Sequence, residues 1–600
     1  MNVLGISAFY HDAACCLLRD GRLVAAAQEE RFSRLKHDPR LPVAAFRFCL
    51  EKGGIGPADL DAVAYYESPV KKLSRQLWSG GPAGRGRSGS RDRSPDLAWL
   101  DPARPERAIR ERLGWDGPLL TFDHHQSHAA SAFFFSGFPR AAVLTVDGVG
   151  EWATTTYGVG EGAALQTFAE VEFPHSLGLL YSTLTAYLGF AVNDGEYKVM
   201  GLAPYGAPRY VDRLRQMVQS GPEGRFTLDM RYFDFVGGPR MFSDALCALL
   251  GEPPRRPGAK ITPFHRDVAS SLQNVLEELL LEKVRWLHGR TGAPDLCMAG
   301  GVALNCVANG RILREGPFAR LFVPPAAGDA GGCLGAAALA HVALTGTAPA
   351  GGGLAHAFLG PSFTADEIAA ILASTGLPAR DFRGAEQALL DAVAERLADG
   401  QVIAWFHGPL EFGPRALGAR SLLADPRPPD IRERLNRVVK RREDFRPFAP
   451  SVLLSHAAEH FELDHPSPFM LETCRVRSPL GLAAITHVDG SARPQTVDPA
   501  TAPRFAGLLE AFRRRTGCPV LLNTSFNRGG EPIVCSPVDA LAAMAEPGID
   551  ALVLEDFVLD ARDVPANWKD LMAAWQPRPS LAGGRLDQTT TLREDLYTFA

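Results

Sequence analysis

Lysine is scarce in this sequence of 600 residues, because only nine of its 63 basic residues are lysine and 54 are arginine. With 68 acidic residues, the chain has a formal net charge of −5. This balance excludes a general electrostatic attraction to nucleic acid. A lysine that is retained against such a bias, as Lys440 is, becomes a candidate for a specific role.

The sequence also lacks long apolar runs and paired-cysteine motifs. No stretch reaches about 18 uninterrupted apolar residues, so no membrane-spanning helix is expected. The start, "MNVLGISAFYHDAA", has no basic region of the kind that opens a signal peptide. The ten cysteines include the adjacent Cys15 and Cys16 but no CxxC, a pattern typical of buried thiols in a reducing compartment. We therefore expect a cytoplasmic protein with no membrane and no nucleic-acid partner.

The length predicts more than one domain, because 600 residues exceed what a single core supports. The Gly/Pro-rich "TGTAPAGGG" is the best candidate linker. A second Gly/Ser/Arg-rich stretch, residues 79–96, is expected to be a flexible surface loop. The expected division is a first domain at 1–345, a linker at 346–354, a second domain at 355–565 and an appended tail at 566–600.

Two segments that begin at Val3 and Val143 share one pattern. Each runs strand, polar or glycine loop, strand, glycine turn, strand, with little identity between them. The first includes an expected hairpin turn at Asp20-Gly21. Two such units indicate a duplicated α/β nucleotide-binding fold, in which each loop offers backbone N–H groups to phosphate.

Three histidines stand close together in "TFDHHQSHAASAFFF". In a helix that starts near His124, the side chains of His124 and His128 project from one face, since they are four residues apart. This spacing suits two ligands of one divalent metal, and it equally suits two polar residues that cap a helix. The motif is not HExxH, because position 125 is His125, so the general base of a metalloprotease is missing.

Two aspartates follow apolar or glycine-rich segments. Asp147 ends the apolar run "AAVLTV", and Asp329 lies in the loop "GDAGG" before a helix of small residues. Two His and two Asp side chains around a metal that also contacts a phosphate oxygen form a chemically coherent site. A turn or N-cap role for each aspartate is the alternative.

The second domain is dense in arginine and asparagine on tight loops. Several of these cations have apolar or Pro neighbours, so they are expected to point inward, toward a carboxylate or a bound phosphate. The loops predict a site for a small, highly charged ligand, with a solvated basic face as the alternative. The candidates are Arg415, Arg420, Lys440, Arg441, Arg442, Arg446, Arg493, Asn523, Ser525, Asn527 and Arg528.

Taken together, these motifs resemble the NodU/CmcH family of O-carbamoyltransferases over nearly the whole chain. The segments that carry the resemblance are "GISAFYHDAACCLL", "QEERFSRLKHD", "HHQSHAASAFFFSGF", "LTVDGVGEW", "NDGEYKVMGLAPYG", "AGGVALN", "GDAGGCLGAA", "GPRALGARSLLADPR", "KRREDFRPFAPSVL", "THVDGSARPQTV" and "NTSFNRGGEPIV". One departure is that relatives often read Asn-x-Arg-Gly-Glu-Pro, whereas Arg528 here directly follows Asn527.

The resemblance implies an N-terminal domain of the actin/sugar-kinase/Hsp70 type and a C-terminal α+β domain similar to YrdC. It implies that carbamoyl phosphate and ATP, with Mg²⁺, give carbamoyladenylate in the second domain. The carbamoyl group then passes to a hydroxyl of a small molecule, a secondary metabolite or glycan, in the first. The resemblance implies no particular acceptor, and a homodimer is the oligomer considered.

The resemblance also implies roles for single residues. Iron(II) or another divalent metal is expected at His124, His128, Asp147 and Asp329, and His11 is expected to act as base on the acceptor hydroxyl. Nucleotide-binding residues are expected at Gly148, Gly300, Gly301, Asn305 and Gly331. Carbamoyl phosphate and the ATP phosphates are expected at Arg415, Lys440, Arg446, Arg493, Asn523, Asn527 and Arg528, with Arg415 and Lys440 as catalytic residues.

Three other functions share some of these signals. A threonylcarbamoyl-tRNA transferase would share the N-terminal motifs but would need a basic RNA-binding face. A metabolite kinase of the same superfamily would leave the spaced histidines without a role. A non-catalytic ATP-binding regulator is the third.

Overall fold

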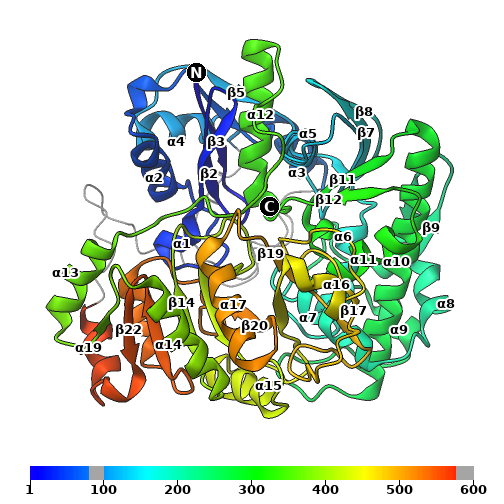
Figure 1. The fold of residues 1–600 in the computed structure, drawn as a ribbon. Coiled ribbons are helices and arrows are strands. Elements are labelled where there is room, and N and C mark those ends of the chain that lie inside the picture. Colours follow the sequence, from blue (N-terminus) through cyan, green and yellow to red (C-terminus); the bar gives the residue numbers. More distant parts are fainter. Residues whose placement is uncertain (80–100, 576–600) are drawn as a thin grey trace, which may run out of the picture. The chain divides into compact units, whose positions relative to one another are not determined.

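The computed structural model describes residues 1–79 and 101–575, and the chain divides into two compact units (Figure 1). Of the described residues, unit 1 holds Met1–Glu29 and His37–Leu354, and unit 2 holds Glu30–Lys36 and 355–575. The loop expected at 79–96 lies outside the described residues apart from Ser79, as does the expected tail beyond residue 575.

Unit 1 contains two five-stranded sheets of the same topology. Their strand orders are β3-β2-β1-β4-β5 and β8-β7-β6-β11-β12. In each sheet the first three strands of the chain pair antiparallel, and the two later strands add in parallel beside the first. This repetition confirms the expected α/β class and the expected duplication. The strands are β1 (Asn2–Ser7), β2 (Ala14–Arg19), β3 (Arg22–Gln28), β4 (Ala62–Tyr65), β5 (Leu119–Thr121), β6 (Arg140–Val146), β7 (Ala153–Glu161), β8 (Ala164–Glu172), β11 (Asp295–Ala299) and β12 (Arg320–Phe322).

The turn between β2 and β3 forms where the sequence predicts it. Asp20 and Gly21 both adopt the left-handed region, with φ of 49° and 74°. Two consecutive left-handed residues match the right-handed twist of a hairpin, which explains the Asp-Gly pair. The remaining elements of unit 1 are α2 (Val43–Gly53), α3 (Pro69–Trp78), α4 (Arg104–Leu113), α5 (His124–Phe133), α6 (Leu177–Tyr187), α7 (Glu196–Leu202), α8 (Val211–Leu214), α9 (Asp244–Leu250), α10 (Pro263–Thr291), α11 (Cys306–Glu315), α12 (Gly332–Thr345), β9 (Val218–Ser220) and β10 (Phe226–Leu228).

Helix α12 is built from small residues, and this lets it approach its neighbours closely. A Cβ atom on Gly335 would lie 1.7 Å from the carbonyl oxygen of Ser127 in α5. A Cβ atom on Gly5 of β1 would lie 1.9 Å from the carbonyl oxygen of Cys333 in α12. Larger residues would force these backbones apart. The glycines therefore hold the start of α12 beside the start of α5, where the predicted metal ligands lie.

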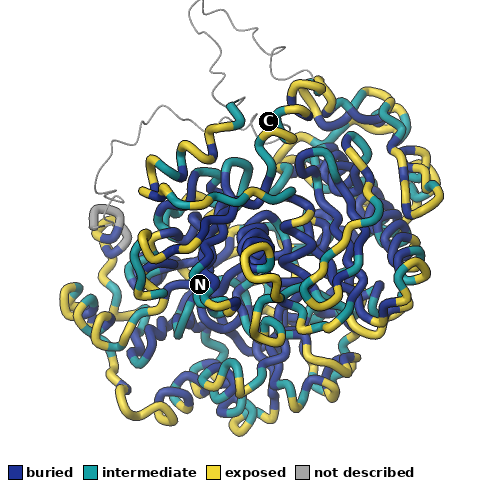
Figure 2. Tube along the Cα trace, turned by 90° about the horizontal axis from the view of Figure 1, so that it is seen from above, coloured by how far each residue is buried: buried dark blue, intermediate teal, exposed yellow. Residues whose placement is uncertain are grey.

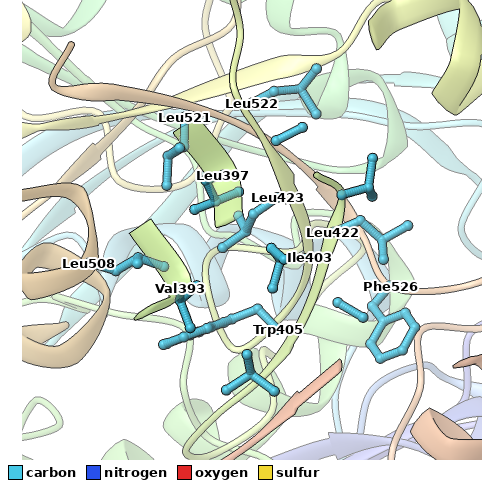
Figure 3. Close-up of a cluster of buried hydrophobic side chains, with 14 of the residues drawn as sticks. Val393, Leu397, Ile403, Trp405, Leu422, Leu423, Leu508, Leu521, Leu522 and Phe526 are labelled. Carbon is cyan, nitrogen blue, oxygen red and sulfur yellow. The ribbon is translucent and has the colours of Figure 1, made fainter. Parts of the chain in front are cut away.

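Unit 2 is organised around a mixed eight-stranded sheet in the order β13-β22-β21-β14-β15-β20-β16-β19. Its helices α14 (Glu386–Ala398) and α17 (Pro503–Thr516) pack on each other, and Figure 3 shows their side chains Val393, Leu397 and Leu508 among those of the sheet. The strands are β13 (Arg380–Asp381), β14 (Ile403–Phe406), β15 (Arg420–Ala424), β16 (Ala449–Leu453), β19 (Gln495–Val497), β20 (Val520–Ser525), β21 (Ala551–Leu554) and β22 (Phe557–Asp560), with β17 (Cys474–Arg475) and β18 (Ser491–Ala492) in a separate pair. The other helices are α13 (Ala365–Thr375), α15 (Asp430–Arg434), α16 (Ala457–His460), α18 (Pro537–Met544) and α19 (Trp568–Trp575).

The division into units differs from the expected boundaries in one internal segment. Residues 30–36, within and after the short helix α1 (Glu29–Ser33), are counted with unit 2. Arg31 donates to the carbonyl oxygen of Gly413 at 2.7 Å, and Arg34 donates to that of Ile533 at 2.6 Å. Phe32 packs against the small apolar cluster that contains Ile533. These contacts join residues that are some 400 to 500 positions apart, so no local pattern predicts them.

The expected linker also has contacts of its own. The Leu354 N–H donates to the carbonyl oxygen of Phe135 at 2.8 Å, within unit 1.

Buried residues lie mainly on strands and inner helix faces, and exposed residues lie at the periphery (Figure 2). All ten cysteines lie in the described part of the chain, none forms a disulfide there, and nine are buried. Among the described residues, no helix combines the length and the apolar character needed to cross a membrane.

Candidate functional site

The two spaced histidines begin helix α5. The N-cap residue, Asp123, forms no side-chain hydrogen bond to the helix. Instead the carboxylate of Glu151 accepts from the His124 N–H at 3.0 Å and also from the Ser68 N–H. The imidazoles of His124 and His128 are therefore not needed as caps, and both side chains are buried.

Two aspartates from other elements meet these imidazoles. Asp147 directly follows β6, and Asp329 begins the short helix η8 (Asp329–Gly331) that leads into α12. Asp147 Oδ2 lies 3.1 Å from His124 Nε2 and 3.6 Å from His128 Nε2. Asp329 Oδ1 lies 3.6 and 3.5 Å from the same two nitrogens. The structure thus brings all four predicted metal ligands together in unit 1.

The four side chains fit one divalent cation. Their ligand atoms all lie within 4.8 Å of one another, and the close pairs are 3.1 to 3.6 Å apart. Ligands held about 2.1 Å from one ion lie roughly 3.0 to 3.4 Å from each other. Both ring nitrogens of His128 and the Oδ2 atom of Asp329 are buried without a hydrogen-bond partner. Buried polar atoms are normally paired, so these atoms are suited to an additional ligand.

The electrostatics of the cluster favour positive charge. Burial lowers the pKa of His128, but the carboxylates of Asp147 and Asp329 outweigh burial and raise that pKa to about 9. Burial alone would raise the pKa of Asp147, yet the adjacent imidazoles of His124 and His128 hold it well below its usual range. If both imidazoles are neutral, the two buried carboxylates attract a proton or a cation, because burial disfavours unpaired negative charge. Two imidazoles and two carboxylates are also the ligand types that zinc, iron(II) and manganese share.

His125, between the two spaced histidines, has a different environment. Its Nδ1 atom lies 2.6 Å from the hydroxyl of Thr145, which also contacts Thr156. Burial, with a smaller effect of His124, holds the pKa of His125 well below its usual range. His125 is therefore a neutral residue that joins α5 to β6.

The glycine turn of "AGGVALN" packs directly on Asp147. A Cβ atom on Gly300, whose φ is 95°, would lie 2.3 Å from the carbonyl oxygen of Val146. The Gly301 N–H donates to Asp147 Oδ1 at 2.7 Å. The two glycines therefore hold the carboxylate so that Oδ2 faces the histidines. Gly331 is required for a similar reason, since its Cβ would lie 2.0 Å from the Ala326 carbonyl oxygen.

The other two predicted nucleotide-binding residues, Gly148 and Asn305, differ in how closely the protein already contacts them. A Cβ atom on Gly148 would lie in open space, with its nearest neighbour, a methyl carbon of Leu179, 3.9 Å away. The Asn305 side chain caps α11 by accepting from the Ala308 N–H, and it forms two reciprocal 3.0 Å hydrogen bonds with the Gln273 amide. Its polar atoms are thus already paired within unit 1.

His11 lies beside the cluster. Its Nε2 atom is 3.6 Å from Asp329 Oδ2, and its Nδ1 atom is 3.0 Å from Asp12 Oδ2. Asp12 also contacts His37 Nδ1 at 2.8 Å. Burial lowers the pKa of His11, but Asp329 and Asp12 outweigh it and raise the pKa to about 9.

In unit 2 the retained lysine, Lys440, is buried and follows one turn of π-helix, Leu435–Val439. Its ammonium group donates to the backbone carbonyl oxygens of Ser525 and Asn527 and to Asn527 Oδ1 at 2.8 Å. Burial lowers its pKa well below the usual range, and the nearby Arg442 and Arg446 lower it further. Lys440 and Asn527, both predicted ligand-binding residues, are therefore hydrogen-bonded to each other.

The loop that carries Arg415 wraps around a buried carboxylate. Glu411 Oε1 accepts from the backbone N–H groups of Leu417 at 2.7 Å and Ala419 at 2.8 Å, with Arg420 at 3.2 Å. Asn523 donates to the carbonyl oxygen of Ala416 in the same loop. Glu411 thus sets the path of the loop, and Asn523 ties it to β20.

The remaining predicted cations are placed differently. Arg528 forms an ion pair with Glu546 at 3.2 Å, and Arg446 lies 3.8 Å from Glu443. Arg493 is half-buried and lies between β18 and β19. Arg420 is fully buried, stacks over Phe406 with 3.5 Å between its guanidinium carbon and the ring centroid, and donates to backbone carbonyls. Arg420 and Arg528 thus have partners inside the protein.

The sequence patterns do not reveal two buried glutamates. Glu151 lies inside the quoted segment "LTVDGVGEW", and Glu411 lies two residues before "GPRALGARSLLADPR". Neither has a spacing that distinguishes it from a surface glutamate. The signal is their burial, which appears only when distant strands assemble.

Comparisons with known proteins are consistent along the chain. The family region described as "Carbamoyltransferase N-terminus" matches residues 2–77 and 110–338, and "Carbamoyltransferase C-terminus" matches 394–561. Nodulation protein NolNO of Sinorhizobium fredii is 39% identical over 588 residues, covering 96% of this chain and 82% of that protein. An uncharacterized protein of Synechocystis, sll1178, is 44% identical over 96% of this chain and 99% of its own length.

A third relative has a defined reaction in its name. The 3'-hydroxymethylcephem-O-carbamoyltransferase of Amycolatopsis lactamdurans is 38% identical over 265 residues, which cover 44% of this chain and 48% of that protein. The two family regions together match most of the described chain. The protein therefore belongs to the carbamoyltransferase family and is a carbamoyltransferase.

Proposed function

We propose that the protein is an ATP-dependent O-carbamoyltransferase that works in two half-reactions. In the first, water releases phosphate from carbamoyl phosphate, and a carbamate oxygen attacks the α-phosphorus of ATP, so that pyrophosphate leaves and carbamoyladenylate forms. In the second, an acceptor hydroxyl attacks the carbamoyl carbon, its proton passes to a base, and AMP leaves. The acceptor is proposed to be a secondary metabolite or a glycan, in line with the names of the nodulation and cephem relatives.

The single observation that carries the second half-reaction is the buried cluster of two histidines and two aspartates. A divalent cation such as Fe²⁺, held by His124, His128, Asp147 and Asp329, would supply positive charge to the adenylate phosphate and so favour departure of AMP. The Gly300-Gly301 turn fixes the orientation of Asp147. His11 lies next to Asp329 and is oriented through Nδ1 by Asp12, so that in the neutral imidazole the Nε2 atom is placed to receive the hydroxyl proton. A cation bound at the cluster would offset the charge of Asp329, which raises the pKa of His11, and would favour this neutral form.

The first half-reaction is assigned to unit 2, the proposed YrdC-like domain. Its loops bring Arg442 and Arg446 near Lys440, and both arginines lower the pKa of that lysine. Carbamoyl phosphate and the ATP phosphates are strongly anionic, and charge-assisted contacts from arginine would bind them and stabilise charge in the displacement. Mg²⁺ is proposed to accompany ATP, as it does in most phosphoryl and adenylyl transfers.

The test follows pyrophosphate, AMP and ADP separately when the protein is mixed with ATP and carbamoyl phosphate. We expect pyrophosphate release that depends on carbamoyl phosphate and needs no acceptor. ADP as the nucleotide product would contradict the proposal and favour a kinase. AMP release should then appear only with a hydroxyl acceptor, which a panel of sugars, macrocycles and aminoglycosides would identify.

Two variants separate the half-reactions. Asp329→Ala should keep carbamoyl-phosphate-dependent pyrophosphate release but lose transfer to the acceptor, because it alters only the cluster in unit 1. Lys440→Met should lose pyrophosphate release. If both variants lose the same step, the assignment of one half-reaction to each unit is wrong.

A further inference from the structure

Helix α3 of unit 1 carries a buried arginine that the two proposed half-reactions leave unused. Arg75 is 3% exposed. Its Nε and Nη1 atoms form no hydrogen bond, and among the described residues no carboxylate lies within ion-pair distance of it. A buried guanidinium without an anionic partner is unfavourable, so its presence calls for an anion beyond the described residues.

The carboxylates nearest to Arg75 are committed to other groups. Glu67 binds the ammonium group of Lys72 at 2.9 Å and accepts from the Tyr65 hydroxyl at 3.1 Å. Glu151 accepts from backbone N–H groups at the start of α3 and of α5. Their charges still act on Arg75, but burial dominates and lowers its pKa. The chain therefore surrounds Arg75 with acidic groups that cannot turn toward it without losing bonds of their own.

The surroundings of Arg75 connect it to the candidate site. Tyr10 lies beside His11 with 4.4 Å between ring centroids. Burial raises the pKa of Tyr10, the nearby Asp329 carboxylate raises it further, and Arg75 acts in the opposite direction. On its other side, the Arg75 guanidinium lies 5.4 Å from the centroid of Phe173. Arg75 thus contacts an aromatic ring and is near Tyr10, the neighbour of His11.

The aromatic surface beside Arg75 is partly open to solvent. Trp78, one helical turn beyond Arg75, is 58% exposed and packs edge-on against Trp152 at 5.7 Å and Phe173 at 6.1 Å. A single exposed apolar side chain is ordinary, whereas exposed aromatic surface that is contiguous with other rings can mark a ligand-binding site. Ring faces beside a buried guanidinium are suited to a reactant that combines an apolar or sugar ring with an anionic group.

We propose that Arg75 binds an oxyacid anion, a carboxylate, sulfate or phosphate group, that belongs to a reactant of unit 1. This inference rests on the proposed carbamoyl transfer, and two reactants can supply the anion. One is the acceptor molecule, and the other is the phosphate of the adenylate. Arginine recognises such groups through charge-assisted hydrogen bonds, and the unpaired Nε and Nη1 atoms of Arg75 are each available to donate one.

The first experiment measures thermal unfolding of the full chain with and without sodium sulfate, at ionic strength matched with sodium chloride. We expect sulfate to raise the Tm of the unit 1 transition of the wild type by at least about 2 °C at saturating concentration. Arg75→Met should lose this shift. It should also unfold at the same or a higher temperature than the wild type without sulfate, because it removes a buried unpaired charge.

Two control variants make this test specific. Lys71→Met changes an exposed lysine on the same helix, which pairs with Asp123, and should keep the sulfate shift. Lys72→Met removes the partner of Glu67 and should lower the Tm while keeping the shift. If Arg75→Met lowers the Tm without sulfate and keeps the sulfate shift, Arg75 is a structural residue and the proposal is wrong.

The second experiment identifies the source of the anion by calorimetric titration with AMP. A loss of AMP affinity of about 10-fold or more in Arg75→Met would assign the site to the adenylate phosphate. Unchanged AMP affinity together with a lost sulfate shift would assign it to the acceptor. The pyrophosphate assay is scored independently: its failure alongside an Arg75-dependent sulfate shift would refute the carbamoyl transfer scheme but leave the anion site.

Discussion

The two candidate regions of this protein contrast in how far their polar groups are already satisfied. In the His/Asp cluster of unit 1, formed by His124, His128, Asp147 and Asp329, both ring nitrogens of His128 and one oxygen of Asp329 are buried without a hydrogen-bond partner. In unit 2, the ammonium group of Lys440 already donates to three oxygens, and Asn527 is one of its acceptors. The first region keeps unpaired polar atoms that suit an additional ligand, whereas the second uses part of its polar content to hold its loops in place.

The difference shows what a polar residue in a glycine-rich loop can mean. Asp147 and Asn527 both follow buried strands, so they are alike at the level of sequence. They differ because Asp147 meets imidazoles from another element, whereas Asn527 meets a lysine and the Glu531 carbonyl oxygen. Whether such a residue binds a ligand or the protein therefore depends on partners that are distant in sequence.

The largest expected effect tests the metal cluster. Asp329→Ala removes one of the two carboxylates and should weaken binding of a divalent cation at least about 100-fold, because loss of a direct ligand exceeds the effect of changing its supporting partners. Competition with a chelator of known affinity, together with metal content after purification, measures this. His125→Asn is the matched control, since it changes a buried histidine of the same helix that contacts Thr145, and it should keep the metal. Equal affinities for the two variants would contradict the assignment.

The next effect tests whether Lys440 is structural as well as functional. Lys440→Met would leave the partly buried carbonyl oxygens of Ser525 and Asn527 without the ammonium donor and should lower the free energy of unfolding of unit 2 by about 3 kcal/mol. Denaturant unfolding followed by circular dichroism measures this. The surface variant Arg562→Met, which removes an exposed ion pair with Asp560, should change stability by less than about 1 kcal/mol. A fully stable Lys440→Met would remove the contrast between the two regions.

Lys440 also gives a prediction for how the free energy of unfolding depends on pH. Burial, Arg442 and Arg446 lower the pKa of Lys440 in the folded protein below its value in the unfolded chain. Between the two values the unfolded chain binds more protons, so the contribution of Lys440 to the free energy of unfolding rises with pH until about 10.4. The stability difference between wild type and Lys440→Met should therefore widen from neutral to alkaline pH. A gap that is constant or narrows would show that the ammonium group is not desolvated.

Much of the fold and of the metal cluster follows from sequence patterns. The spacing of His124 and His128 fixes one helix face, and a carboxylate at a strand end is held where loops converge, so their meeting could be predicted. The role of Glu411 could not, because its acceptor function depends on the path of a loop in which three N–H groups turn toward it. The placement of residues 30–36 with unit 2 also depends on contacts across hundreds of residues.

A smaller effect is expected from two buried glutamates that support the two regions in similar ways. Glu151→Gln and Glu411→Gln each keep one acceptor oxygen but lose the charge that holds backbone N–H groups. Glu151→Gln should weaken metal binding about 10-fold and leave pyrophosphate release unchanged. Glu411→Gln should raise the KM for carbamoyl phosphate, through the Arg415 loop, and leave metal affinity unchanged. If either variant affects the readout of the other unit, the two regions are not supported independently.

The smallest effect concerns the nucleotide role predicted for Asn305. Because its amide pairs reciprocally with Gln273 and caps α11, Asn305→Ala should lower the free energy of unfolding by about 1 to 2 kcal/mol. A double-mutant cycle with Gln273→Ala should give a coupling of about 1 kcal/mol, as expected for residues in direct contact.

Affinity for AMP distinguishes a structural role of Asn305 from a nucleotide-binding role. If Asn305 is purely structural, Gln273→Ala and Asn305→Ala should change AMP affinity equally little, since neither amide is available to a ligand. If Asn305→Ala alone weakens AMP binding, then the nucleotide displaces Gln273, and unit 1 also contains a polar pair that a ligand can open.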